Sequence, residues 1–353
     1  MSWLKRRYYS IKESESIRLG FQSYDDVEVL NLSIGIPILN EVSIMDKSLK
    51  SFPYGTATLS NSVRANIIKL MFKSDLNVNH IIPTLGAKGG LKLLLDVLDV
   101  KKMGLFYPTW LGYKSLAEIN DIGVVEIPRS ISREGLIKKI RETDIIIICN
   151  PNNPTGEILN FNDFVDLIHI CEENHTLLIL DEVYKDLAFS DLSEFDKIVS
   201  PNLIRLGSFS KSFGLPGLRL GYIHCINNEL INAATLYVQH SYTSLPMLVS
   251  SIVENLTLDC KNQYLNTVMP LYKQRIDEVA NLLKTLGLKI WSQDSAFYLY
   301  VETELEINLA DFFFESYSII AVSGVAYGGN YNQARLSLAI SDADYEKLKL
   351  RLS

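Results

Sequence analysis

The sequence predicts an α/β protein built around a mostly parallel β-sheet. From about residue 80 to 225, short apolar runs rich in Val, Ile and Leu alternate with longer amphipathic stretches. The apolar runs do not alternate with polar residues, which is typical of strands covered on both faces. A strand–helix–strand order in this rhythm indicates a layered domain with helices on both sides of the sheet.

The elements follow in order along the chain. We expect strands at 104–107, 124–127, 145–149, 177–180, 203–207 and 220–224, with helices at 90–100, 113–119 and 161–173 between them. One long helix is predicted from about residue 243 to 286, followed by strands at 296–301, 318–322 and 334–339. The expected organisation is a large domain over 46–240 and a smaller α+β domain formed by 1–45 and 241–353.

Composition limits the classes of function. The net charge of −7 disfavours a nucleic-acid partner, which would require a basic face. The cysteines form no CxxC pair, so we expect free thiols in a reducing compartment and no metal site; they are Cys149, Cys171, Cys225 and Cys260. No apolar segment follows the basic start, and the longest aliphatic runs have strand length, so the sequence predicts a cytoplasmic protein without a membrane span.

Polar and aromatic residues follow the predicted strands at the points where the strands end. Trp110, Asn153, Asp181 and Lys211 each lie within a few residues of the end of an apolar run. Ligands of open α/β sheets bind beyond the carboxyl ends of the strands. The sequence therefore predicts a binding site at this edge of the sheet.

Lys211, in the stretch SFSKSFG, is an unusual residue for the end of a buried strand. A lysine amine can form an imine with an aldehyde and later move a proton. Taken alone, the residue is better explained as a solvated lysine at a strand end. Its neighbours decide how it is interpreted.

Asp181 and Tyr184 follow another strand, in the stretch DEVY. A carboxylate beside a pyridine nitrogen would keep that nitrogen protonated, although an aspartate after a strand also commonly caps a helix. Tyr184 lies three residues further on, where a turn can bring it to the same side. Tyr184, like Trp110, is also explained by packing in the core.

Two segments have the composition of anion sites. Hydroxyl and backbone N–H donors are offered by Ser208, Ser210 and the helix start that follows them. The guanidinium of Arg219 can bind an anion in a bidentate way. Gly86, Ala87 and Lys88 precede an apolar helix and form a second candidate, although a glycine-rich helix start is often only a turn.

Taken together, the motifs NPNNPTG, DEVY and SFSKSFGLPGLRLGY resemble the class I and II aminotransferases, which are pyridoxal 5'-phosphate (PLP) enzymes of fold type I. The matched motifs run from about Gly35 to Arg335 in the family's order. The resemblance implies a three-layer α/β/α large domain with a mostly parallel sheet and a smaller α+β domain. It also implies PLP as the cofactor.

The resemblance assigns roles by position. Lys211 corresponds to the Schiff-base lysine that also moves the substrate proton, Asp181 to the partner of the ring nitrogen, and Asn153 and Tyr184 to donors to the ring oxygen. Trp110 corresponds to the stacking aromatic. The phosphate ligands are matched by Ser208, Ser210 and Arg219, with the helix start at Gly86, Ala87 and Lys88.

On the substrate side, Arg335 corresponds to the arginine that binds the α-carboxylate, and Gly35 to a glycine next to the substrate, where Asn153 also contributes. Tyr54 corresponds to a tyrosine that reaches the phosphate of the neighbouring subunit, which implies a homodimer with shared active sites. Leu59 stands where many relatives carry glycine.

The leading interpretation is an aminotransferase that moves the α-amino group of an amino acid to a keto acid. An alternative is a PLP-dependent cyclase that acts on a hydroxylated arginine, because the start WLKRRYY followed by Lys12 resembles capreomycidine-synthase-like enzymes. In that case Glu13, Glu15, Asp25 and Asp26 would face a guanidinium, or they form only a solvated helix. C–S lyase and decarboxylase chemistry also occur on this fold. A ligand-sensing domain of a transcription regulator is disfavoured because Lys211 and Asp181 are both present.

Overall fold

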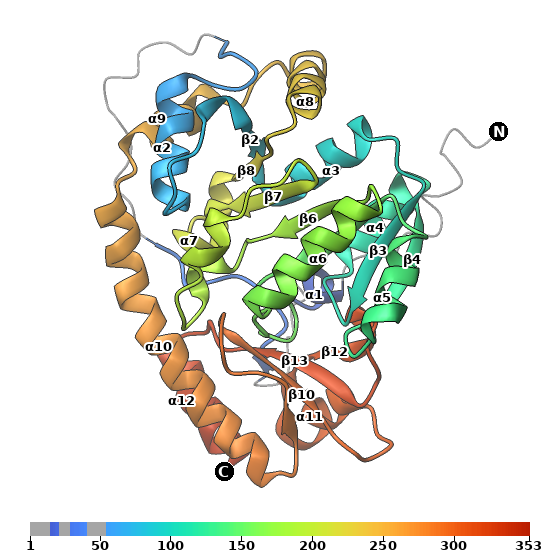
Figure 1. The fold of residues 1–353 in the computed structure, drawn as a ribbon. Coiled ribbons are helices and arrows are strands. Elements are labelled where there is room, and N and C mark those ends of the chain that lie inside the picture. Colours follow the sequence, from blue (N-terminus) through green and yellow to red (C-terminus); the bar gives the residue numbers. More distant parts are fainter. Residues whose placement is uncertain (1–14, 21–28, 41–53) are drawn as a thin grey trace, which may run out of the picture.

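The computed structural model describes residues 15–20, 29–40 and 54–353. Its described part contains a seven-stranded sheet flanked by helices and a second, four-stranded sheet below it (Figure 1). The large sheet has the order β2 (Ile81–Leu85), β8 (Leu220–His224), β7 (Leu203–Ser208), β6 (Leu177–Asp181), β5 (Ile145–Cys149), β3 (Lys102–Tyr107) and β4 (Gly123–Pro128). In this sheet β8 runs opposite to the other six strands, which are parallel to one another. The predicted fold class is confirmed.

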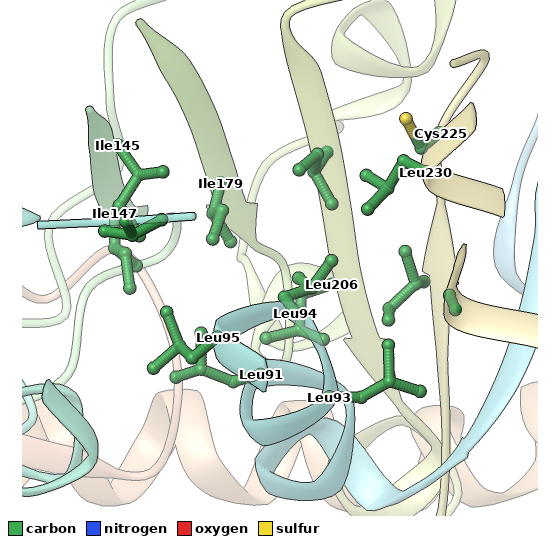
Figure 2. Close-up of a cluster of buried hydrophobic side chains, with 14 of the residues drawn as sticks. Leu91, Leu93, Leu94, Leu95, Ile145, Ile147, Ile179, Leu206, Cys225 and Leu230 are labelled. Atoms are coloured by element: carbon green, nitrogen blue, oxygen red, sulfur yellow. The ribbon is translucent and has the colours of Figure 1, made fainter. Parts of the chain in front are cut away.

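Both faces of the large sheet are buried, as the uninterrupted apolar runs predicted. On β5, Ile145 and Ile147 face one core while Ile146 and Ile148 face another, because successive side chains of a strand point to opposite faces. Figure 2 shows the first core, in which α3 (Gly86–Val97) packs its leucines onto the strands. The helices α4 (Gly112–Ile119) and α8 (Asn228–Ser241) cover the same face, and α5 (Arg133–Ile140) and α6 (Phe161–Glu173) cover the other.

The antiparallel second sheet has the order β12 (Val322–Ser323), β13 (Gln333–Ser337), β10 (Tyr298–Glu302) and β9 (Lys289–Ile290). Beside it, β1 (Leu30–Asn31) pairs with β11 (Ile319–Ile320), which ties the N-terminal segment to this end of the molecule. The remaining helices of this part are α1 (Glu15–Gly20), α11 (Leu309–Tyr317) and α12 (Asp342–Leu352). Within the described residues, no helix combines the length and apolarity needed to cross a membrane.

The single helix predicted over 243–286 is wrong. The segment forms α9 (Met247–Asn255) and α10 (Leu258–Thr285), because the backbone is extended at Leu256 and the Thr257 hydroxyl caps a new helix by accepting from Cys260 N–H. α9 packs on α2 (Asn61–Met71) beside the large sheet, and α10 runs along the molecule to the second sheet (Figure 1). The domain boundary near residue 240 stays a prediction.

Two further features differ from the simplest expectation. The edge strand β2 is absent from the predicted set because its five residues, IIPTL, include a proline and give a short signal. Leu59 adopts a φ of 59°, the left-handed region that favours glycine, while its side chain is buried against α2. Burial of the leucine therefore accompanies a strained backbone at this position.

Candidate active site

A cavity of about 390 Å³ lies at the carboxyl-terminal edge of the large sheet. Strands β2, β3, β5, β6 and β7 all end at this edge, and the antiparallel β8 begins there. The loops that follow these strands therefore converge, as the sequence predicted. The volume of this cavity is in the range of small-molecule binding sites.

Twelve of the fourteen site residues expected from the sequence line this cavity; they are Gly35, Ala87, Lys88, Trp110, Asn153, Asp181, Tyr184, Ser208, Ser210, Lys211, Arg219 and Arg335. Gly86 lies directly behind the wall, where a Cβ on it would be 2.7 Å from Arg219 Nη2. Tyr54 is not in the lining, and its side chain is 88% exposed. The roles of these residues remain predictions, but the structure brings all except Tyr54 together.

One end of the cavity collects donors for an anion. Ser208 Oγ lies 2.9 Å from Ser210 Oγ and accepts from Ser210 N–H at 3.1 Å, which holds both hydroxyls at the start of α7 (Phe209–Ser212). Nearby, α3 begins after Leu85 without a side-chain cap or an acidic residue in its first turn. Its first N–H groups therefore have no capping side chain, and an anion is the partner they favour.

Asp181 has both carboxylate oxygens oriented by donors. Tyr113 Oη donates to Oδ2 at 2.7 Å, and Val183 N–H donates to Oδ1 at 3.0 Å. The side chain is 6% exposed. Burial raises the pKa of Asp181 to about 6, and the two hydrogen bonds oppose that rise. Asp181 thus presents to the cavity a carboxylate that is oriented by two hydrogen-bond donors and favours a cationic partner.

The amine of Lys211 lies inside the cavity without a carboxylate partner among the described residues. It donates to the carbonyl oxygen of Gly35 and lies 5.3 Å from the centre of the Phe297 ring. Desolvation lowers the pKa of the Lys211 amine to about 7, with further lowering from Arg335, Arg219 and Lys88. The neutral amine that reacts with an aldehyde is therefore accessible near neutral pH.

Arg335 reaches the cavity from β13 of the second sheet. Its Nη2 donates to Ser33 O at 2.7 Å and its Nη1 to Asn153 Oδ1 at 3.2 Å, while Nε has no hydrogen-bond partner. The guanidinium is 2% exposed and forms no salt bridge with any described residue. A buried cation of this kind is suited to an anionic ligand.

Sequence reasoning missed several lining residues, most notably Tyr113. It lies one helical turn after Trp110, with the two rings edge to face at 5.1 Å, so its spacing was the available signal. Cys149 pairs in register with Asp181 on the neighbouring strand and also lines the cavity. All four cysteines are free, and Cys260 alone among them is not fully buried.

Most of the N-terminal residues considered for a guanidinium substrate lie outside the described residues; these are Trp3 to Tyr9, Lys12, Glu13, Asp25 and Asp26. Glu15 is described, at the start of α1. Burial raises the pKa of Glu15, and the backbone N–H of Ser323 donates to its carboxylate. Glu15 is not among the residues that line the cavity.

Residues 31–352 match the family model for aminotransferase class I and II. The aspartate aminotransferase of Thermococcus kodakarensis is 25% identical over 86% of this chain and 82% of its own length. The LL-diaminopimelate aminotransferase of Chlamydia pneumoniae is 26% identical over 93% and 89%. The structure of Thermus thermophilus aspartate aminotransferase with maleate superposes with a TM-score of 0.86 at 21% identity, covering 99% of both chains.

Proposed function

The chain belongs to the class I and II aminotransferases, and we propose that it moves the α-amino group of an amino acid to a keto acid with Lys211 as its central residue. The enzyme class and the cofactor, PLP, are as the sequence predicted. The observation that carries the proposal is the position of Lys211. Its amine has a lowered pKa and lies in one cavity with an oriented carboxylate and an unpaired buried arginine.

The residues present fit PLP. The start of α3 with Ser208, Ser210 and Arg219 would hold the phosphate, and the closeness of Gly86 to Arg219 leaves no room for a side chain there. Asp181 would hold the proton on the ring nitrogen, Asn153 and Tyr184 would donate to the ring oxygen, and Trp110 would cover a ring face. The aldehyde and aromatic ring of bound PLP combine with amino groups and take up the electrons left when a bond to Cα breaks.

The side chains of this protein supply the remaining steps. Arg335 would bind the α-carboxylate and so orient the substrate, with Gly35 beside the guanidinium, where a Cβ would be 3.4 Å from Arg335 Nη1. Lys211 would hold PLP covalently, be displaced by the substrate amine, and then take up and return the Cα proton. Because the Lys211 amine has no carboxylate partner among the described residues, it can gain or lose a proton without breaking a salt bridge.

Tyr54 is proposed to complete the phosphate site of a neighbouring subunit. The exposed ring lies next to Gly55, which packs near Met247 at the start of α9. Sedimentation of the purified protein tests the implied homodimer. If the protein is a dimer in which Tyr54 contacts the phosphate, Tyr54→Phe weakens PLP binding without changing the sedimentation coefficient.

The central test is the covalent link. Lys211→Ala is expected to abolish the borohydride-reducible attachment of PLP and to lower turnover by about 10⁴-fold, the upper range for loss of a proton-transfer group. Lys88→Ala, a lysine of the same cavity, is the matched control and keeps the link. A link that survives in Lys211→Ala would overturn the assignment.

Transamination itself is tested by mixing the PLP-loaded enzyme with single amino acids. We expect the yellow absorbance to bleach and keto acid to form in a stoichiometric first half-reaction, followed by recovery when a second keto acid is added. Conversion of 3- or 4-hydroxyarginine to a cyclic product without keto-acid consumption would instead identify a cyclase.

A further inference from the structure

The chain segment 33–40, which we call the strap, crosses the cavity after β1. Ile34, Gly35 and Ile36 line the cavity directly. Among the described residues, no backbone-to-backbone hydrogen bond holds the strap until Asn40 N–H donates to Gly214 O at 3.1 Å. The position of this wall of the cavity therefore depends on side chains from elsewhere in the fold.

Asn31 Oδ1 accepts locally from the N–H and the hydroxyl of Ser33, at 3.1 and 2.6 Å. Beyond this local contact, side chains that are distant in the sequence hold the strap at three points. Arg335 donates to Ser33 O at 2.7 Å, and Lys211 donates to Gly35 O. At the third point, two tyrosines of α10 form hydrogen bonds with both backbone groups of Ile38. Its N–H donates to Tyr272 Oη at 2.7 Å, and its carbonyl oxygen accepts from Tyr264 Oη at 2.9 Å.

The first two points use groups that the reaction needs. Under the proposed function, Lys211 binds the cofactor and Arg335 binds the substrate carboxylate. Their hydrogen bonds to Gly35 O and Ser33 O therefore cannot both persist throughout turnover. Tyr264 and Tyr272 are buried, at 5% and 0% exposure, and neither lines the cavity. Their hold on Ile38 is thus independent of ligands.

We propose that Tyr264 and Tyr272 are positioning residues that anchor the strap while Lys211 and Arg335 change partners, and that they thereby set substrate affinity. The inference rests on the proposed function for the roles of Lys211 and Arg335. The anchor is itself rigidly placed. The Tyr272 ring packs on Phe297 at 5.3 Å, and Tyr264 packs so closely on Gly214 that a Cβ there would be 2.6 Å from its ring.

The Tyr264→Phe/Tyr272→Phe double variant tests this proposal, because it removes both hydroxyls and leaves the rings in the core. Loss of two hydrogen bonds is expected to raise KM for both substrates by about tenfold, with kcat changed by less than about threefold. Tyr300→Phe is the matched control. Tyr300 is equally buried and its hydroxyl donates to Gln333 at 2.9 Å, away from the strap.

Hydrogen–deuterium exchange on the cofactor-free protein provides a readout that needs no activity. The amides of 33–40, Ile38 above all, should exchange about tenfold faster in the double variant and at the unchanged rate in Tyr300→Phe. Unchanged exchange in the double variant would refute the anchor. Faster exchange with an unchanged KM would refute its role in substrate affinity. If the unmodified enzyme performed another reaction, only the proposed function would fail, because the exchange result stands on its own.

Discussion

Two groups of charged residues flank the end of strand β6, and they are built differently. The cavity contains the cations Lys88, Lys211, Arg219 and Arg335 around Asp181. On the other side lies what we call the Glu182 network, which consists of Glu182, Lys185, Asp196 and Arg205. Arg205 Nη1 donates to Glu182 Oε1 at 2.8 Å, and the Lys185 amine bonds Asp196.

Both groups include residues from the same five-residue stretch, DEVYK at 181–185. Asp181 and Tyr184 face the cavity, whereas Glu182 and Lys185 face the network. In the network two positive and two negative charges balance within the protein, and the one carboxylate oxygen left without a hydrogen-bond partner is Glu182 Oε2. In the cavity the cations outnumber the described carboxylates, which favours a ligand that carries negative charge. Charge balance thus distinguishes a structural cluster from a binding site.

The largest effect on stability is expected from the network. Arg205→Leu should lower the free energy of unfolding by about 3–5 kcal/mol, because it leaves the buried Glu182 with only Lys185 as a cationic partner, at 3.8 Å. Urea denaturation measures this change. The double variant Arg205→Leu/Glu182→Leu should recover part of the loss, and an equal or larger loss in the double variant would show that the network is not balanced as described.

The corresponding change in the cavity is expected to affect activity instead. Arg335→Leu should lower kcat/KM by about 10²-fold or more, since it removes the charge-assisted contact proposed for the substrate carboxylate. Because no internal salt bridge is lost, the free energy of unfolding should fall by less than in Arg205→Leu. Steady-state kinetics and urea denaturation on the same samples decide; a large stability loss with near-normal kinetics would reverse the comparison.

A smaller effect is expected at Asp181. Its carboxylate loses one of its two donors in Tyr113→Phe, and since that hydrogen bond lowers the pKa of Asp181, the pKa should rise above its value of about 6. More of the carboxyl group is then protonated near neutral pH, so PLP binding should weaken by about tenfold at pH 6 and less at pH 8. Titration of the cofactor by absorbance at both values checks this, and a pH-independent loss would exclude the carboxylate as the cause.

The smallest effect concerns the pH dependence of cofactor loading. With the pKa of Lys211 near 7, its neutral fraction rises about fivefold from pH 6 to 7 and little above pH 8, so the loading rate should follow that curve. Arg335 contributes to the lowered pKa, so Arg335→Leu should move the midpoint to higher pH. Arg205→Leu should leave it unchanged, and a midpoint that moves in both variants would mean that the two regions are electrostatically coupled.

The layered fold and the grouping of most site residues could be predicted from the sequence alone. The strands at 145–149 and 220–224 coincide with β5 and β8, because buried parallel strands carry a continuous apolar signal. The loops after such strands meet at one edge whatever the details of packing, so Asp181, Asn153 and Lys211 could be grouped before any coordinates. The short edge strand β2 and the break at Leu256–Thr257 were missed, because their local signals are weak.

Which charged groups are left without partners depends on how the chain packs. Nothing in the chain order separates Arg335 from Arg205, yet one lies unpaired in a cavity and the other is neutralised by Glu182. Similarly, DEVYK does not reveal that its charged residues point to opposite sides, or that Tyr113 orients Asp181. Such pairings join residues tens to hundreds of positions apart, and burial and charge balance are properties of the packed chain that local sequence does not encode.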